Sequence, residues 1–207
     1  MICDVIFDFD GVIADTRDLL FDAFRAYDPT ISEEDFLAHF DGNVYETPRV
    51  RFTPEGAAQL HGTYCRNLRA RHVEAAIGPI GQLAARHRLF IISSGDERGI
   101  LGALGQAGLG GAFHAIYGHN THRSKVTKFK MIRDAFDVSL ESAVFVTDTL
   151  GDIWEARTLN ITTIAETFGF HDRGRLEQGE PHVIVDSWDE VVAEISRADA
   201  DHRRGAL

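Results

Sequence analysis

The stretch VIFDFDGVIADT, residues 5–16, joins a short apolar run to two aspartates that are separated by one phenylalanine. Residues i and i+2 of an extended chain point the same way, so Asp8 and Asp10 can face one site while Phe9 turns into the core. Gly11 allows the chain to turn sharply and to approach a ligand closely. The stretch therefore predicts a buried strand that ends in an acidic site.

Five further apolar segments have the length of strands and are bounded by turns. The six predicted strands are Val5–Phe7, Leu89–Ile92, Ala115–Tyr117, Ala143–Thr147, Ile161–Ala165 and Val183–Val185. Helical patterns separate the later strands, at Gly99–Ala107, Lys128–Phe136, Gly151–Leu159 and Trp188–Ile195. Strands that alternate with helices indicate a parallel sheet that is covered on both faces. We therefore expect an α/β fold with a Rossmann-like parallel sheet core.

The segment between the first two strands breaks this alternation and has only helical patterns. Arg17–Tyr27 has apolar residues at helical spacing, and Ser32 followed by three acidic residues is typical of a helix start. Thr53-Pro54-Glu55 predicts another start, because proline suits the first helical position. That helix can extend to Arg71, and Gly78-Pro79 marks the return to the sheet.

These patterns predict two structural units and a tail. We expect a small all-helical domain at residues 16–78, here named the helical insertion. Residues 1–15 and 79–200 are expected to form the α/β core, and residues 201–207 a flexible tail. Asp15-Thr16 and Gly78-Pro79 are the expected hinges between insertion and core.

Composition and charge exclude several classes of protein. The 207 residues are 44% hydrophobic and 26% charged, which is ordinary for a globular protein. A net charge of −11 argues against general nucleic-acid binding, which needs a basic surface. No apolar stretch is long enough to cross a bilayer, and the N-terminus lacks the pattern of a signal peptide. We expect a cytoplasmic protein with no nucleic-acid or membrane partner. Cys3 is expected to be a small buried residue, and neither Cys3 nor Cys65 has metal-ligand spacing.

Polar residues follow three of the predicted strands. Ser93 and Ser94 follow Leu89–Ile92, while Asp148 and, four residues later, Asp152 follow the next long strand. Ligands of parallel α/β sheets bind beyond the carboxyl ends of the strands, where these side chains and the first two aspartates would meet. A phosphate bound there would find serine hydroxyls for its oxygens and one of the lysines for its charge. The only lysines are Lys125, Lys128 and Lys130.

Four carboxylates at one site require a counter-charge. Asp8, Asp10, Asp148 and Asp152 would repel one another and raise their pKa values if no cation were present. Mg²⁺ suits such a site, because it takes a few carboxylate oxygens and keeps some water. A calcium loop is excluded, because counting from Asp8 places Leu19 at position 12, where glutamate is needed. Each motif alone also fits a turn, a helix cap or a solvated face, and only their combination at strand ends is specific.

With the motifs FDFDGVIADT, IISSG, SKVTKFK and VTDTLGDIWEA, the sequence resembles the haloacid dehalogenase superfamily, in particular its aspartate-nucleophile phosphatases. LGQAGLGGAF, TIAETFGF and VIVDSWDEVV also look like that family. The resemblance covers residues 1–15 and 79–197. It places the helical insertion where the family carries a helical cap domain.

The resemblance implies a role for each motif residue. Asp8 resembles the nucleophile that forms an aspartyl-phosphate, and Asp10 the acid/base. Ser93, with Ser94 beside it, resembles the phosphate-binding hydroxyl. Lys125 resembles the lysine that neutralises the phosphate and the nucleophile.

The fourth motif also resembles that of the family, and the sequence departs from the family pattern at two positions. Asp148 is similar to the Mg²⁺ ligand and Asp152 to its nearby helper. The family's third motif is often lysine followed by proline, whereas here it is Lys125-Val126, so Lys128 competes for this role. Thr147 stands where glycine or glutamate is frequent.

The presence of Asp10 favours a phosphatase over a dehalogenase, which has no alkoxide to protonate. A phosphonate hydrolase would need a lysine in the insertion, which contains none. A phosphosugar mutase and a non-catalytic phosphoacceptor, similar to a response-regulator receiver, stay open as alternatives. We expect a Mg²⁺-dependent hydrolase of a small phosphate ester, such as phosphoglycolate, a sugar phosphate or a nucleotide.

Substrate contacts are expected from the insertion, which would close over the leaving group. Its predicted loop at residues 40–52 contains four candidate contacts. They are Asn43, Tyr45, Arg49 and Arg51. The arginines could equally pair with nearby glutamates. His61, Tyr64 and Arg69 lie at helical spacing and fit either packing or the surface.

Overall fold

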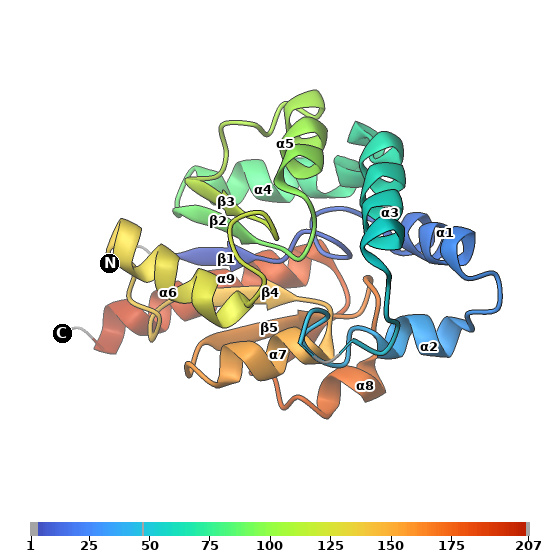
Figure 1. Cartoon of the computed structure of the whole chain (residues 1–207). Coiled ribbons are helices and arrows are strands. Elements are labelled where there is room, and N and C mark those ends of the chain that lie inside the picture. The colour runs from blue at the N-terminus through green and yellow to red at the C-terminus, as the bar shows by residue number, and fades with distance from the viewer. Residues whose placement is uncertain (1–3, 47, 206–207) are drawn as a thin grey trace.

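The computed structural model describes residues 4–46 and 48–205, so the expectation for Cys3 lies outside the described residues. Its centre is a six-stranded sheet in which all neighbouring strands are parallel (Figure 1). The strands are β1 (Val5–Phe7), β2 (Leu89–Ile92), β3 (Ala115–Tyr117), β4 (Val144–Thr147), β5 (Thr162–Glu166) and β6 (Val183–Val185). Their order is β3-β2-β1-β4-β5-β6. The predicted α/β fold is confirmed.

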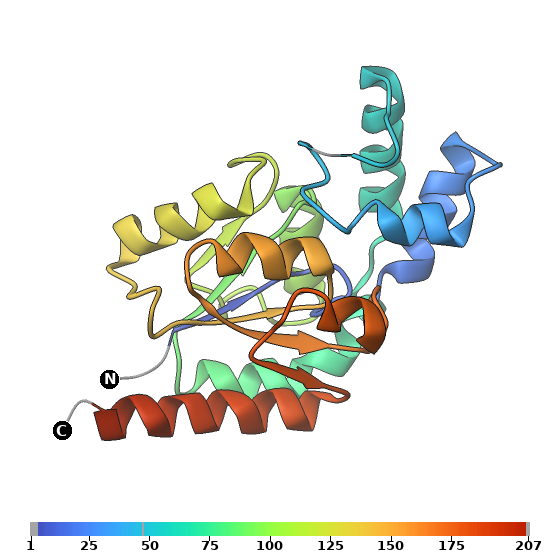
Figure 2. The same ribbon diagram turned by 90° about the horizontal axis from the view of Figure 1, so that it is seen from below.

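Helices cover both faces of this sheet. One face carries α4 (Ile77–Ala84), α5 (Glu97–Gln106) and α9 (Trp188–Gly205), and the other carries α6 (Lys125–Phe136) and α7 (Leu150–Arg157) (Figure 2). A short helix, α8 (Arg173–Glu177), packs beside β5 and β6. Successive strand residues serve opposite faces, so Phe7 packs in the α4/α5/α9 layer and Ile6 in the α6/α7 layer. This double burial explains why β1 and β2 are entirely apolar.

The helical insertion contains α1 (Arg17–Tyr27), α2 (Glu33–Ala38) and α3 (Pro54–Asn67), and lies to one side of the sheet (Figure 1). The two expected helix caps are present. Ser32 Oγ accepts the Asp35 N–H at 3.0 Å, and Thr53 Oγ1 accepts the Gly56 N–H at 3.1 Å. An aromatic cluster fills the space between the helices, where the Phe24 ring lies 5.0 Å from the Phe52 ring.

The chain leaves the insertion earlier than the sequence suggested. α3 ends at Asn67 instead of extending to Arg71, because Leu68 has an extended backbone (φ −62°, ψ 129°). A 3₁₀ helix, η1 (Ala70–Ala76), follows and packs in the core. The two connections run side by side, since the Asp15 N–H donates to the His72 carbonyl at 2.7 Å.

Two further boundaries differ from expectation. Gly78-Pro79 lies within the first turn of α4 and not in a turn between the two units. Proline is accommodated there because N–H groups of the first turn have no partner inside a helix. α9 continues through Gly205, into the segment for which a flexible tail was expected. Among the described residues, no helix has the length and apolar character needed to span a membrane.

Candidate active site

The predicted site residues meet where the strand order reverses. β1 lies between β2 and β4, so Asp8, Ser93 and Asp148, which follow these three strands, come to one edge of the sheet. Asp152 joins them from the first turn of α7. Such a reversal point is the usual ligand site of an open parallel sheet.

Lys125 lies at the centre of this group. Its Nζ is 2.8 Å from Asp8 Oδ2 and also donates a hydrogen bond to Asp152 Oδ2, and its side chain is 3% exposed. Burial lowers the pKa of Lys125, but the charges of Asp152 and Asp8 outweigh burial and hold that pKa above its usual value. Lys125 is therefore a fully charged ammonium group between two carboxylates.

Lys128 has a different environment, although it is also buried. Its Nζ donates a hydrogen bond to the backbone carbonyl of Ser93. Burial and the charge of Lys125 lower the pKa of Lys128 to about 8. The geometry thus brings Lys125, and not Lys128, against the first-motif carboxylate.

The pKa values of the three carboxyl groups are shifted in different directions. Burial, with Asp152 and Asp148 nearby, raises the pKa of Asp8 well above its usual value despite Lys125. Burial also raises the pKa of Asp148 to about 7. Burial acts in the same direction on Asp152, but Lys125 and the hydrogen bonds of Asp152, including one from Thr147 Oγ1 at 2.7 Å, lower its pKa overall. One lysine does not neutralise three neighbouring carboxylates, so Asp8 and Asp148 bind protons more readily than usual.

Asp10 is contacted by the helical insertion. Its Oδ1 accepts hydrogen bonds from Thr16 Oγ1 at 2.8 Å and from the Tyr64 hydroxyl on α3. Burial raises the pKa of Asp10, although these two hydrogen bonds work against the increase. A carboxyl group with a raised pKa beside Asp8 is suited to donating a proton and then accepting one. Helical spacing alone could not distinguish this role of Tyr64 from packing.

The site needs glycine beside Asp148. Gly11 has φ +83°, and a Cβ at this position would lie 1.9 Å from Asp148 Oδ2. On the other side, the Phe170 N–H donates to Asp148 Oδ2 at 2.8 Å. The Phe170 ring lies 4.8 Å from the Phe40 ring of the insertion. One short loop therefore touches both Asp148 and the insertion.

The carboxylate oxygens at this site suit a cation that takes its remaining ligands from a bound molecule. Asp148 Oδ1 is buried and has no hydrogen-bond partner. Within residues 4–46 and 48–205, no group of three or more His, Cys, Asp or Glu side chains is arranged to hold a metal by itself. Mg²⁺ uses one or two carboxylates and takes its other ligands from water and phosphate. Asp148 Oδ1 is open to such a cation, whereas Asp8 Oδ2 contacts Lys125, and Asp152 Oδ2 is engaged by Lys125 and Thr147.

Glu166 is a further buried acid at this edge, and it was not among the predicted site residues. Its Oε2 accepts N–H groups from Phe168 at 2.6 Å and Gly169 at 3.0 Å, while its Oε1 has no partner. Burial and the charge of Asp148 raise the pKa of Glu166 well above its usual value. The predicted strand ended at Ala165, so the position of Glu166 directly after a strand was the signal that could have identified it.

The insertion and the core enclose a cavity of about 690 Å³ above Asp8. Asn43 and Tyr45 line it, as do Ser93 and Ser94. Asn43 Nδ2 donates to Glu155 Oε1 at 3.0 Å, and the Tyr45 hydroxyl donates to the Ser94 carbonyl at 2.6 Å. Arg51 lines the cavity as well, so three of the predicted contacts from the insertion are brought to the site.

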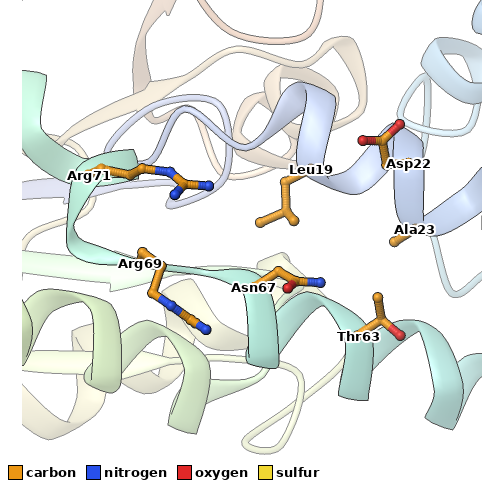
Figure 3. Close-up of a pocket in the computed structure, with 7 residues that line it drawn as sticks. All are labelled: Leu19, Asp22, Ala23, Thr63, Asn67, Arg69 and Arg71. Carbon is orange, nitrogen blue, oxygen red and sulfur yellow. The ribbon is translucent and has the colours of Figure 1, made fainter.

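Three arginines of the insertion lie outside this cavity. Arg49 is exposed and pairs with Asp35 at 3.7 Å, so the structure does not bring it to the cavity. Arg69 and Arg71 line a separate hollow of about 340 Å³ between α1 and α3 (Figure 3). Arg69 Nη1 donates to the Leu68 carbonyl at 2.8 Å. None of the predicted catalytic residues lines this second hollow.

Residues 5–166 match the family model of the haloacid dehalogenase-like hydrolases. The chain belongs to this family. The resemblance carried by the four motifs is thereby confirmed. No curated protein matches the chain.

Solved structures of haloacid dehalogenase-like proteins share the fold. A hydrolase of this family from Streptococcus pneumoniae is 19% identical, with a TM-score of 0.77 over 93% of this chain and 98% of that one. A β-phosphoglucomutase from Clostridium difficile is 15% identical, with a TM-score of 0.75 over 98% and 99% of the two chains. A predicted phosphoglycolate phosphatase from Haemophilus somnus is 15% identical, with a TM-score of 0.70 over 93% and 97%.

Proposed function

We propose that this hydrolase is a phosphatase that cleaves a small phosphate monoester through an aspartyl-phosphate on Asp8. The observation that carries the proposal is the buried contact of 2.8 Å between Lys125 Nζ and Asp8 Oδ2. An anionic carboxylate can approach an anionic phosphate only where positive charge offsets their repulsion. Lys125 supplies that charge at the attacking oxygen.

Two steps follow from the arrangement. An Asp8 oxygen bonds to phosphorus while the ester bond breaks, and the leaving alkoxide takes a proton from Asp10. A water then attacks phosphorus and gives a proton to Asp10, which releases phosphate and restores Asp8. The raised pKa of Asp10 supports its service as the acid in the first step. Ser93 and Ser94, which line the cavity, are the proposed phosphate contacts.

Mg²⁺ is the proposed cofactor. Asp8 and Asp148 would hold it, with Asp10 beside them and Asp152 in a supporting position. When bound, Mg²⁺ would add to the positive charge that Lys125 supplies near Asp8. The unpartnered Asp148 Oδ1 and the raised pKa of this carboxyl group support the assignment.

The first experiment is hydrolysis of p-nitrophenyl phosphate with and without Mg²⁺. The wild type, Asp8→Asn and Asp18→Asn are compared, the last being a control on the exposed side of α1. We expect activity that requires Mg²⁺, falls at least about a thousandfold in Asp8→Asn and is unchanged in Asp18→Asn. Activity that survives Asp8→Asn would overturn the nucleophile assignment. Labelling of Asp8 by acyl phosphates without phosphate release would favour the mutase or the phosphoacceptor alternative.

A further inference from the structure

The cavity above Asp8 is large for a small leaving group. Its volume of about 690 Å³ falls in the range of roughly 300–1,000 Å³ that is common for sites of drug-sized ligands. The phosphoryl group occupies only the end next to Asp8 and Lys125. The rest of the space lies beneath the helical insertion and must be filled by the leaving group or by water.

Apolar side chains of the insertion form the far wall of this space. Leu20, Phe24, Val50, Phe52 and Leu60 line it. They belong to the aromatic cluster that holds the insertion together, so the wall is backed by packed rings and is not free to rearrange. Water against such a wall is readily displaced by an apolar ligand.

Most polar side chains of the insertion that line the cavity are already bonded to the protein. The pairs are Asn43 with Glu155, Tyr45 with the Ser94 carbonyl, Tyr64 with Asp10, and His39 Nδ1 with the Val50 N–H. Each hydroxyl of a sugar loses hydrogen bonds to water on entering and needs replacements. Apart from Arg51 and His61, the insertion side of the cavity offers few of them.

A pair of stacked imidazoles forms a third surface of the cavity. The rings of His61, on α3, and His119, in the loop after β3, lie 4.5 Å apart with an angle of 25° between their planes. His119 Nδ1 is buried and has no hydrogen-bond partner. Burial, assisted by the neighbouring His119, lowers the pKa of His61, so this ring is neutral at pH 7. The pair presents a flat surface, and the buried Nδ1 of His119 can form a hydrogen bond with a ligand.

We propose that the substrate is the phosphate ester of an alcohol with a planar, largely apolar body, aryl or heteroaryl, and not a sugar phosphate or phosphoglycolate. The apolar wall takes the body of the leaving group, and the imidazole pair takes its flat face or a polar edge. This inference rests on the proposed phosphatase function and names the substrate class of the same site.

The test compares primary alkyl phosphates, whose leaving alcohols are similarly basic. We expect kcat/KM for 2-(1-naphthyl)ethyl phosphate to exceed the values for glucose 6-phosphate and phosphoglycolate at least about tenfold, because apolar contacts discriminate by about that factor or more. A kcat/KM that is equal or higher for glucose 6-phosphate or phosphoglycolate would overturn the substrate class and leave the phosphatase function standing.

Two leucine variants test whether the preference for the naphthyl ester arises at the apolar wall. Leu60→Gln places an amide in the apolar wall, and Leu101→Gln makes the same change on α5, where the side chain is 51% exposed. We expect Leu60→Gln to lower kcat/KM for the naphthyl ester about tenfold and to leave acetyl phosphate unaffected. Leu101→Gln is expected to change neither. Equal effects of Leu60→Gln on both substrates would contradict contact between the wall and the leaving group.

Binding separates this inference from the proposed reaction. Titration calorimetry on Asp8→Asn measures the affinity for each ester without turnover. Tighter binding of the naphthyl ester than of glucose 6-phosphate, with no hydrolysis of any ester by the wild type, would support the ligand class and overturn the phosphatase function. Tighter binding of glucose 6-phosphate would overturn the ligand class whatever the activity.

Discussion

The two ends of the cavity are both buried, yet they are built from opposite chemistry. At the core end, Asp8, Lys125 and Asp152 form an ionic group whose members fix one another. At the insertion end, Phe24 and Phe52 form part of an apolar wall. Ionic contacts are strongly position-dependent, whereas apolar burial depends mainly on area. The core end is therefore suited to one reaction, and the insertion end to recognising shape and polarity.

The largest effect is expected when the ionic end loses its central cation. Lys125→Met leaves Asp8 and Asp152 as buried carboxylates without their partner, which typically costs about 3–5 kcal/mol of stability. The activity on p-nitrophenyl phosphate should fall about a thousandfold. Urea unfolding and kcat/KM measure the two effects.

Lys128→Met is the matched variant. Lys128 donates to the Ser93 carbonyl, and its pKa is already lowered to about 8, so its replacement should cost only about 1–3 kcal/mol. A larger loss of activity in Lys128→Met than in Lys125→Met would reverse the assignment of the third-motif lysine.

The ionic end should also make stability depend on pH when no metal is present. The pKa of Asp148 is about 7 in the folded protein and near 3.8 when unfolded, so between these values the folded state binds more protons. Stability should therefore fall as pH rises from about 4 to about 7, by an amount on the order of a few kcal/mol. Melting temperatures in EDTA should decrease across this range, and Mg²⁺ should reduce the decrease. A flat or rising profile in EDTA would contradict the raised pKa.

Glu166→Gln tests the neighbouring acid. The amide oxygen can still accept the N–H groups of Phe168 and Gly169, while the charge near Asp148 is removed. In EDTA at pH 8 we expect the stability to rise by about 1–2 kcal/mol, because a buried like charge is lost. The affinity for Mg²⁺ should weaken about tenfold. Calorimetry measures the affinity, and Glu177→Gln, at an exposed position of α8, is the control. An unchanged affinity would remove Glu166 from the cation site.

The smallest effect is expected at Tyr45, whose hydrogen bond joins the insertion end of the cavity to the core end. Tyr45→Phe removes the hydrogen bond of 2.6 Å from the insertion to the Ser94 carbonyl, which is worth about 1 kcal/mol. The value of kcat/KM should fall about fivefold. The Tyr27 hydroxyl accepts the Thr53 N–H within the insertion, so Tyr27→Phe should leave kcat/KM unchanged. Equal effects of the two changes would show that the bond to the core has no special importance.

The sheet could be predicted closely because its signals are local. β1, β2, β3 and β6 have the predicted bounds, since each is a short apolar run bounded by turns. The C-terminal end of α3 was not predictable in the same way. Nothing in the sequence between Asn67 and Arg71 forbids helix, and the extended backbone of Leu68 accompanies the return of η1 to the core.

The sequence could predict which residues form the site, but not which of them contact one another. Strand ends identified Asp8, Ser93 and Asp148 as neighbours. The choice between Lys125 and Lys128 was open because both lie on the buried side of one helix, one turn apart. Arg49 lies in an irregular segment, where no periodicity indicates the direction of a side chain, and its pairing with Asp35 needed the structure.

The loop that carries Phe170 has a consequence for how binding events combine. Its N–H holds Asp148 Oδ2, and its ring packs against Phe36 and Phe40 of the insertion. Phe170 therefore links the position of Asp148 to the packing of the insertion, so we expect a displacement of either to affect the other. Thermodynamic reciprocity requires the two couplings to be equal. If Mg²⁺ changes the equilibrium constant for closure of the insertion by some factor, closure changes the affinity for Mg²⁺ by the same factor. Cation binding and closure of the insertion therefore favour or oppose one another equally.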